Sequence, residues 1–390
     1  MESMDITNKE SILGIRQRAR DVDHASRTKR RSLARDARRV DLDDIVKKLQ
    51  VPSREELLVL AEQLKKQKDL GTLQRLRLGL VSDESISAFL DWNGALYAVV
   101  GCLTGQDASL QREAACTLIN LALGSEKQCL DICQKAGVYL VMHISNNNPQ
   151  LQVCIKDPCA WCIGNLCGTH KSVCQLLQRQ GAEDALVKLL ESYVPHVTQS
   201  AAYALMQYLT TMPERIEVIA TPSMVTRLIE GLGKVDEGIA DVGWCLFTLS
   251  TRKEVCCVLI DNGIIQAAFN TLEKLTNQQS LNVSATTSLV RVVLNCVGAV
   301  PGASVEVYHR SEQLVSVIKA LLYSPQPHLR TETLHMLSNV INAVSGDTNT
   351  GQPIVNDLNL KSSLENAVRS ALAARFTQDP PNTSSFQCNA

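Results

Sequence analysis

The sequence has few aromatic residues, no long apolar run and almost no net charge. Aromatics are 4% of the 390 residues, whereas hydrophobic residues are 45%. This composition favours helix-on-helix packing over an aromatic-rich β-sandwich. No stretch reaches the roughly 18 uninterrupted apolar residues of a membrane span, and the opening MESMDITNKE lacks an apolar signal segment. We therefore expect a soluble, intracellular chain with no membrane partner.

Motifs for catalysis are also missing. We find no phosphate-binding loop, nucleophile elbow or paired acid motif, and the histidines are scattered. The stretch DPCAWCIGNLCGTH, residues 157–170, holds three of the fourteen cysteines, but no second C-x-x-C follows at zinc-finger spacing. A zinc or redox site is the lesser alternative; cysteines in a reducing compartment are mostly small buried groups. We expect no enzyme activity, metal or cofactor, and Pro158 in the first turn of its helix, where a missing N–H is harmless.

Sliding the chain along itself reveals an internal repeat. Six segments align on an anchor column, and a second column lies four residues later, at spacings of 45, 42, 41, 47 and 44 residues. The pairs of anchor and second-column residues are Cys116/Asn120, Trp161/Asn165, Tyr203/Gln207, Trp244/Thr248, Arg291/Asn295 and His335/Asn339. A weaker seventh copy, QRLRLGLVS, aligns Arg75 and Gly79 with the two columns.

The repeat has the pattern of a packed helix. Positions one before, two after, three after and six after the anchor share one helical face and are almost all apolar, whereas the two columns form an adjacent, more polar stripe. Breakers such as SNNNPQ, SYVPHV and SPQPHL precede the helix that carries the columns. A unit of this length cannot bury its apolar face alone and stacks on its neighbours. The period predicts an all-α, right-handed α-solenoid of about seven or eight armadillo-type repeats over residues 50–376, followed by a Pro-rich, disordered tail at 377–390.

The two columns indicate a binding surface. A side-chain amide offers both a donor and an acceptor, so a row of amides can bind the backbone of an extended peptide without reading its sequence. Aromatic rings beside the row can grip the stems and charges of lysine and arginine. Asn or Gln recurs in five of the six copies. That recurrence favours a peptide-binding groove over the alternative that Trp161 and Asn165 are ordinary residues of a partly buried helix.

At this point the sequence resembles the importin-α (karyopherin-α) family of armadillo proteins. REAACTLINLALGSEKQCLDICQKAGV and DPCAWCIGNLCGTHKSVCQLLQRQGA are similar to the family's second and third repeats, and IADVGWCLFTLS, LVRVVLNCVGAV and SPQPHLRTETLHMLSNV to segments of later ones. The resemblance covers most of residues 55–345. It implies a peptide groove formed by the paired columns above, with acidic residues one turn before the anchors: Glu113, Asp157, Asp241 and Glu332.

The resemblance also implies an N-terminal arm that binds importin-β. Between Arg16 and Arg39 there are ten Lys or Arg and only three Asp. A helix there would carry one cationic stripe, formed by Arg16, Arg20, His24, Arg27, Arg31, Arg35 and Arg39. We expect residues 1–49 to be disordered until they meet an acidic partner. The alternatives are a solvated basic tail or a nuclear localisation signal at Lys29–Arg31; without interleaved aromatics, nucleic-acid binding is not expected.

The sequence departs from the family at points that matter for its ligand. Only Trp161/Asn165 is an intact tryptophan–asparagine pair. Thr169 stands where the third repeat of the family has the aspartate that meets a cargo lysine, and Val300 stands near an acidic position of the later basic site. The resemblance implies a nuclear import adaptor in cytoplasm and nucleus, which binds importin-β and cargo with extended basic segments. The alternative is an armadillo interaction scaffold without an import role.

Overall fold

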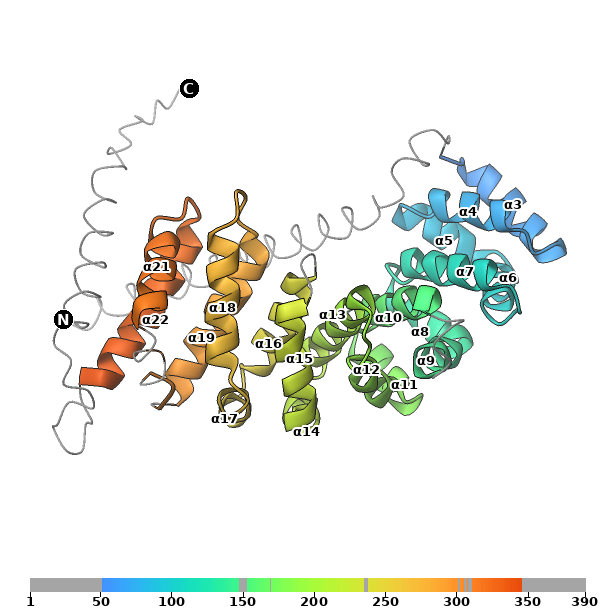
Figure 1. Cartoon of the computed structure of the whole chain (residues 1–390). Helices are drawn as coiled ribbons and strands as arrows, with labels where there is room; N and C mark the ends of the chain where they lie inside the picture. The colour runs from blue at the N-terminus through green and yellow to red at the C-terminus, as the bar shows by residue number, and fades with distance from the viewer. Residues whose placement is uncertain are drawn as a thin grey trace, which may run out of the picture. The chain divides into compact units, whose positions relative to one another are not determined.

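The computed structural model describes residues 51–146, 153–168, 170–234, 238–300, 302–304, 307 and 311–345 (Figure 1). Side chains are described in these ranges except at 153, 234, 311–314 and 341–345. From Arg54 onward the described residues belong to one compact unit. Most of them are helical, and none lies in a β-strand, which confirms the expected all-α class. The predicted N-terminal arm and C-terminal tail lie outside the described residues.

Seven helices carry or precede the two sequence columns, and we call them the ladder helices. They are α4 (Leu70–Gly79), α7 (Ala108–Leu121), α10 (Val153–Cys167), α13 (Pro195–Thr211), α16 (Ile239–Leu249), α19 (Val283–Ala299) and α22 (Pro327–Ser345). Each ladder helix packs on the next, from α4 to α22 (Figure 1). This continuous stacking is the predicted α-solenoid.

Two further helices precede each ladder helix from α7 to α19 and complete its repeat. The first of each pair is short: α5 (Asp83–Asp91), α8 (Glu126–Ile132), α11 (Lys171–Arg179), α14 (Ile216–Ile219) and α17 (Lys253–Asp261). The second helices are α6 (Ala95–Leu103), α9 (Val138–Ser145), α12 (Ala182–Leu189), α15 (Pro222–Lys234) and α18 (Ile264–Thr276). The α3 helix (Arg54–Lys66) packs on α4, and α21 (Ser311–Leu322) packs on α22. A π-helical turn, Cys133–Gly137, and a 3₁₀ turn, Pro213–Arg215, complete the list.

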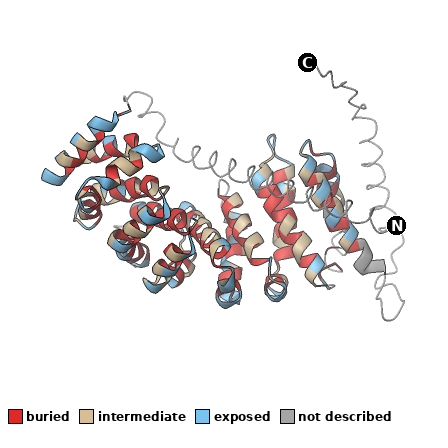
Figure 2. Cartoon of the chain, turned by 180° about the vertical axis from the view of Figure 1, so that it is seen from behind, coloured by how far each residue is buried: buried red, intermediate tan, exposed pale blue. Residues whose placement is uncertain are grey.

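The apolar columns of the sequence form the core between repeats. Residues one before and two after the anchors, such as Ala160 and Ile163, are fully buried where ladder helices meet (Figure 2). Where α16 crosses α19, the contact needs a glycine, because a Cβ added to Gly243 would lie 2.2 Å from the Ser288 hydroxyl oxygen. Among the described residues, no single helix is both long and apolar enough for a membrane span, and two bent helix pairs pass that test only when each pair is taken together.

Two local expectations are wrong. Pro158 does not lie in the first turn, because α10 begins at Val153 and places the proline inside the helix. Its missing N–H therefore removes an interior hydrogen bond to the carbonyl four residues earlier, that of the exposed Cys154. The weak N-terminal copy is also out of register by one residue. Asn120 donates to the Arg77 carbonyl as Asn165 donates to the Ile119 carbonyl, which aligns Gln74 and Leu78, rather than Arg75 and Gly79, with the columns.

A buried polar network fastens α12 to α13 and to the turn that follows. The fully buried Tyr208 donates its hydroxyl to Glu183 at 2.6 Å. Arg215 forks onto the same carboxylate, with Nε 2.9 Å from Oε2 and Nη2 2.6 Å from Oε1. Burial by itself raises the pKa of Glu183, but the hydrogen bonds from Arg215 and Tyr208 outweigh burial and hold the pKa below its ordinary value of 4.5. A charged carboxylate is therefore part of the folded state.

Replacing this network should reduce stability in a pH-dependent way. We expect Tyr208→Phe to lower the free energy of unfolding by about 1.5–3 kcal/mol at pH 7, because the lost hydrogen bond has a charged acceptor. A group whose pKa is depressed on folding stabilises above its unfolded pKa, and this stabilisation is lost as the pH falls through the folded pKa. Glu183→Gln should therefore be less stable than the natural protein at pH 7, and the difference should shrink below about pH 4.5. Urea unfolding at pH 7 and pH 3.5 measures both effects; an equal deficit at the two pH values would contradict this assignment.

Candidate functional site

The predicted column residues lie on successive ladder helices and form one row, which we call the ladder face. Its anchors are Cys116, Trp161, Tyr203, Trp244, Arg291 and His335, and its second column is Asn120, Asn165, Gln207, Thr248, Asn295 and Asn339. The anchors are half-buried, apart from the exposed His335, whereas Asn120 and Asn165 are only 8% and 7% exposed. The structure therefore brings the predicted residues together in order, with the amides set deeper than most of the anchors.

The best-formed part of the ladder face spans α10 and α13. The rings of Trp161 and Tyr203 meet edge to face, with centroids 6.5 Å apart. The Tyr203 hydroxyl donates to Asn165 Oδ1 at 2.8 Å and accepts from Gln207 Nε2 at 3.1 Å. Gly164 permits this approach, because a Cβ there would lie 2.7 Å from the Tyr203 ring. Aromatic and amide groups of two neighbouring repeats thus form one connected cluster.

The column asparagines also bind neighbouring repeats. Asn120 Nδ2 donates to the Arg77 carbonyl and Asn165 Nδ2 to the Ile119 carbonyl, each at 3.1 Å. Asn295 Nδ2 donates to the Ser250 hydroxyl at 2.9 Å. Sequence reasoning assigned these amides to a ligand backbone and missed their contacts between repeats. An amide nitrogen carries two hydrogens, so each group retains capacity for a ligand while one hydrogen joins two helices.

All four predicted acidic residues are engaged by a neighbouring ladder helix. Glu113 pairs with Arg77 of the preceding helix, and Glu332 pairs with Arg291, whose Nη2 lies 2.5 Å from Oε1. Asp157 accepts from the Ser200 hydroxyl at 2.5 Å, and Asp241 accepts from Gln199 Nε2 at 2.8 Å. Two of the four carboxylates are therefore already neutralised by arginines of the chain itself.

Arg291 also contacts two aromatic rings of the preceding repeat. Its guanidinium carbon lies 5.5 Å from the Trp244 ring centroid and 5.6 Å from that of Phe247. The two rings meet edge to face, and Trp244 Nε1 donates to the Ser284 hydroxyl at 2.9 Å. Phe247 was not singled out from the sequence, because it occupies a position that other repeats fill with ordinary apolar residues.

The cysteines of residues 157–170 are packing groups, as predicted. Cys159, Cys162 and Cys167 are completely buried. Burial is the main cause that holds the thiol pKa values of Cys159 and Cys162 well above normal, and a hydrogen bond with Cys174 is the main cause at Cys167. Burial also raises the pKa of the anchor Cys116 to about 11. Among the described residues, no cluster of three or more His, Cys, Asp or Glu is arranged to hold a metal ion.

Some predicted positions cannot be placed. Thr169 and the arm residues Arg16, Arg20, Arg27, Arg31, Arg35 and Arg39 lie outside the described residues. Val300 directly follows α19 and is half-buried. The predictions for the arm therefore remain predictions.

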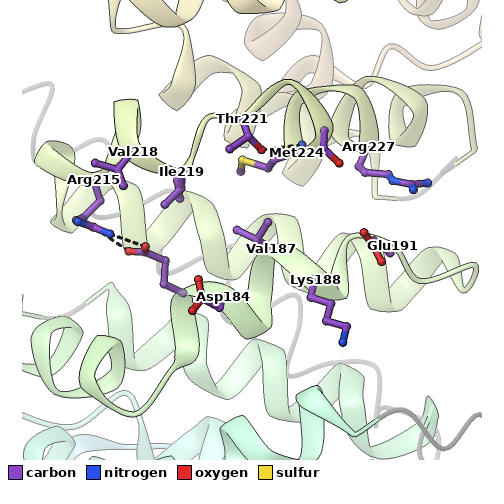
Figure 3. Close-up of a pocket in the computed structure, with 12 residues that line it drawn as sticks. Asp184, Val187, Lys188, Glu191, Arg215, Val218, Ile219, Thr221, Met224 and Arg227 are labelled. Carbon is purple, nitrogen blue, oxygen red and sulfur yellow. Dashed lines mark hydrogen bonds and ion pairs between the residues drawn. The ribbon is translucent and has the colours of Figure 1, made fainter.

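A separate cleft of about 480 Å³ lies between α12 and the α14–α15 pair (Figure 3). Val187, Val218, Ile219 and Met224 give it an apolar centre. Charged residues surround this centre, including the Glu183–Arg215 pair at one side and Lys188, Glu191 and Arg227 at the other. None of its lining residues belongs to the ladder face, and the cleft was not expected from the sequence.

Comparisons with known proteins bear on the fold more than on the ligand. No protein-family model matches the sequence. Importin subunit alpha-9 of Arabidopsis thaliana is 24% identical over 256 residues, which cover 63% of this chain and 48% of that protein. This chain thus spans about half the length of that relative.

Solved structures of engineered proteins share the architecture. A designed armadillo repeat protein matches with a TM-score of 0.52 at 20% identity, over 62% of this chain and 100% of the other. A second designed armadillo protein, solved in complex with the peptide (KR)4, gives a TM-score of 0.51 at 22% identity, over 62% and 99% of the two chains. The chain is therefore an armadillo-repeat solenoid that is distantly similar to importin-α in sequence.

Because Asn165 joins three helices, its replacement should affect folding before any ligand is present. We expect Asn165→Ala to lower the free energy of unfolding by about 1–3 kcal/mol, since the Ile119 carbonyl and the Tyr203 hydroxyl both lose a partner. Denaturant unfolding of the ligand-free protein measures this change. Thr210→Ala is a suitable control, because that exposed hydroxyl bonds only within its own helix. Equal stability of the two variants would mean that the Asn165 amide does not hold the repeats together.

Proposed function

We propose that the chain is a binding adaptor that holds an extended peptide segment along the ladder face. The observation that carries the proposal is the cluster of Trp161, Asn165, Tyr203 and Gln207, in which aromatic walls and amide groups recur at the same helical positions in consecutive repeats. An extended backbone presents donors and acceptors at regular intervals. Amide side chains can meet these groups, while the rings enclose side chains of the ligand.

The related proteins support a peptide as the ligand. A designed armadillo protein with the same architecture was solved with the basic peptide (KR)4. In this chain Asp157 and Asp241 accept hydrogen bonds from neutral partners, so they retain negative charge near the α10–α16 part of the ladder face. We propose that cargo with an extended basic segment binds there, in the part of the face that holds the intact tryptophan–asparagine pair.

We further propose that the chain acts as an importin-α-like adaptor in nuclear protein import. In this role the basic arm, residues 1–49, binds importin-β, and the protein passes between cytoplasm and nucleus. The proposal rests on the distant similarity to importin-α and on the ten Lys or Arg between Arg16 and Arg39. A long flexible cationic segment is suited to wrapping around an acidic partner surface.

A scaffold without an import role is the second candidate. It is favoured by the internal pairing of Glu113 and Glu332 with arginines, because those carboxylates offer less attraction to a basic cargo. The two functions share the peptide surface and differ in the arm.

The peptide surface is tested by titrating the full chain with fluorescent (KR)4. We expect Trp161→Ala to weaken binding about tenfold, because an aromatic contact with a cationic side chain is lost. Trp92→Ala is the matched control, since Trp92 follows α5 and carries no column position. Equal affinities for the natural protein and Trp161→Ala would remove the ladder face as the peptide site.

The import role is tested by a pull-down of the full chain with importin-β at about 0.15 M salt, where long-range charge attraction is screened. We expect binding by the natural chain and its loss when Arg27, Arg31 and Arg35 are all changed to Ala. The control changes Lys65, Lys66 and Arg75, three exposed cations of the folded unit, to Ala. Peptide binding without importin-β binding would identify the chain as a scaffold.

A further inference from the structure

The slot beside Trp244 is already filled by a side chain of the protein. Arg291 extends from α19 between the Trp244 and Phe247 rings of α16, at 5.5 and 5.6 Å, and the Glu332 carboxylate of α22. Both Nε and Nη2 of Arg291 donate to the same oxygen, Glu332 Oε1, at 2.9 and 2.5 Å. Three successive ladder helices therefore contribute to one cation site, and the cation belongs to the chain.

These groups are the ones that an incoming lysine or arginine would use. Aromatic faces attract a cation, and a carboxylate beside them neutralises its charge. The Glu332 side chain is only 15% exposed, and its second oxygen, Oε2, is buried without a hydrogen-bond partner in the described structure. The site thus retains an unused acceptor, although a cation is already present.

We propose that Arg291 is a built-in occupant of the Trp244 slot that excludes cationic side chains of a ligand. This inference rests on the proposed peptide function and specifies the ligand. A segment that runs along the ladder face carries its basic residues over α10 and α13 and uncharged residues where it crosses α16, α19 and α22. Arg291 is then a specificity-determining residue.

The exclusion has two physical causes. A second cation in the slot would repel the guanidinium of Arg291 at short range. To admit that cation, Arg291 would have to leave both rings and the only carboxylate that it contacts there. An uncharged segment avoids both costs and can pass over the arginine.

Fluorescence anisotropy with two labelled eight-residue peptides, (KR)4 and the uncharged (QS)4, tests the proposal on the full chain. We expect Arg291→Ala to bind (KR)4 about tenfold more tightly than the natural protein, because a carboxylate and two rings become available, while affinity for (QS)4 is unchanged. Arg291→Gln, which retains a donor toward Glu332, should show a smaller gain. Arg227→Ala removes the same charge from the cleft side of α15 and should behave like the natural protein.

A double variant distinguishes the slot from a general charge effect. Arg291→Ala combined with Trp244→Ala should lose most of the gain, because one wall of the slot is then missing. Thermal unfolding of each variant establishes that it is folded. An Arg291→Ala protein that binds (KR)4 no better than the natural chain would overturn the proposal, and so would a double variant that keeps the full gain.

The outcomes also distinguish this inference from the proposed function. If the natural protein binds (KR)4 through Trp161 but Arg291→Ala gives no gain, the peptide function stands and the inference fails. If neither peptide binds any variant, the peptide function fails as well. A gain in Arg291→Ala supports both.

Discussion

Every ladder helix buries one side against the helix before it and another against the helix after it, and the rest of the molecule depends on this stacking. Each ladder helix alone would expose the apolar residues that flank its anchor, such as Ala160 and Ile163 in α10. Stacking buries them and at the same time fixes the register of the polar column beside them. The functional row is therefore a consequence of the core, because a residue one position from a buried column can point only to the ladder face.

The stacking also decides how polar groups of the ladder face are satisfied. Asn120 and Asn165 lie so near the helix contact that a carbonyl of the neighbouring repeat is within hydrogen-bond distance. A buried amide without partners would cost free energy, so these contacts favour a rigid, preformed row. A ligand that met amides already held in place would lose less conformational freedom on binding than one that had to order them.

The sequence was sufficient for the period, the apolar columns and the order of the anchors, because these follow from helical geometry and recur in each copy. It was insufficient wherever a contact depends on a single neighbour. Arg77 looked like a flaw in an apolar column; the shifted register of α4 instead places it beside Glu113. Phe247 is apolar like its counterparts, and only the approach of Arg291 distinguishes it. Pro158 fits a helix start by composition, but stacking extends α10 by a turn before it. The cleft beside α12 follows from the spacing of repeats, which no local pattern encodes.

These observations bear on how a repeat protein can change its ligand while keeping its fold. The apolar columns cannot vary freely, since a change in volume is felt by two neighbours at once. The anchor column has more freedom, and here it contains a thiol, two indoles, a phenol, a guanidinium and an imidazole. An arginine at one anchor reaches the rings of the preceding repeat and a carboxylate of the following one, so one residue can alter three adjoining positions of the surface. Ligand choice in such an array can therefore change by substituting an anchor, without disturbing the stacking that positions it.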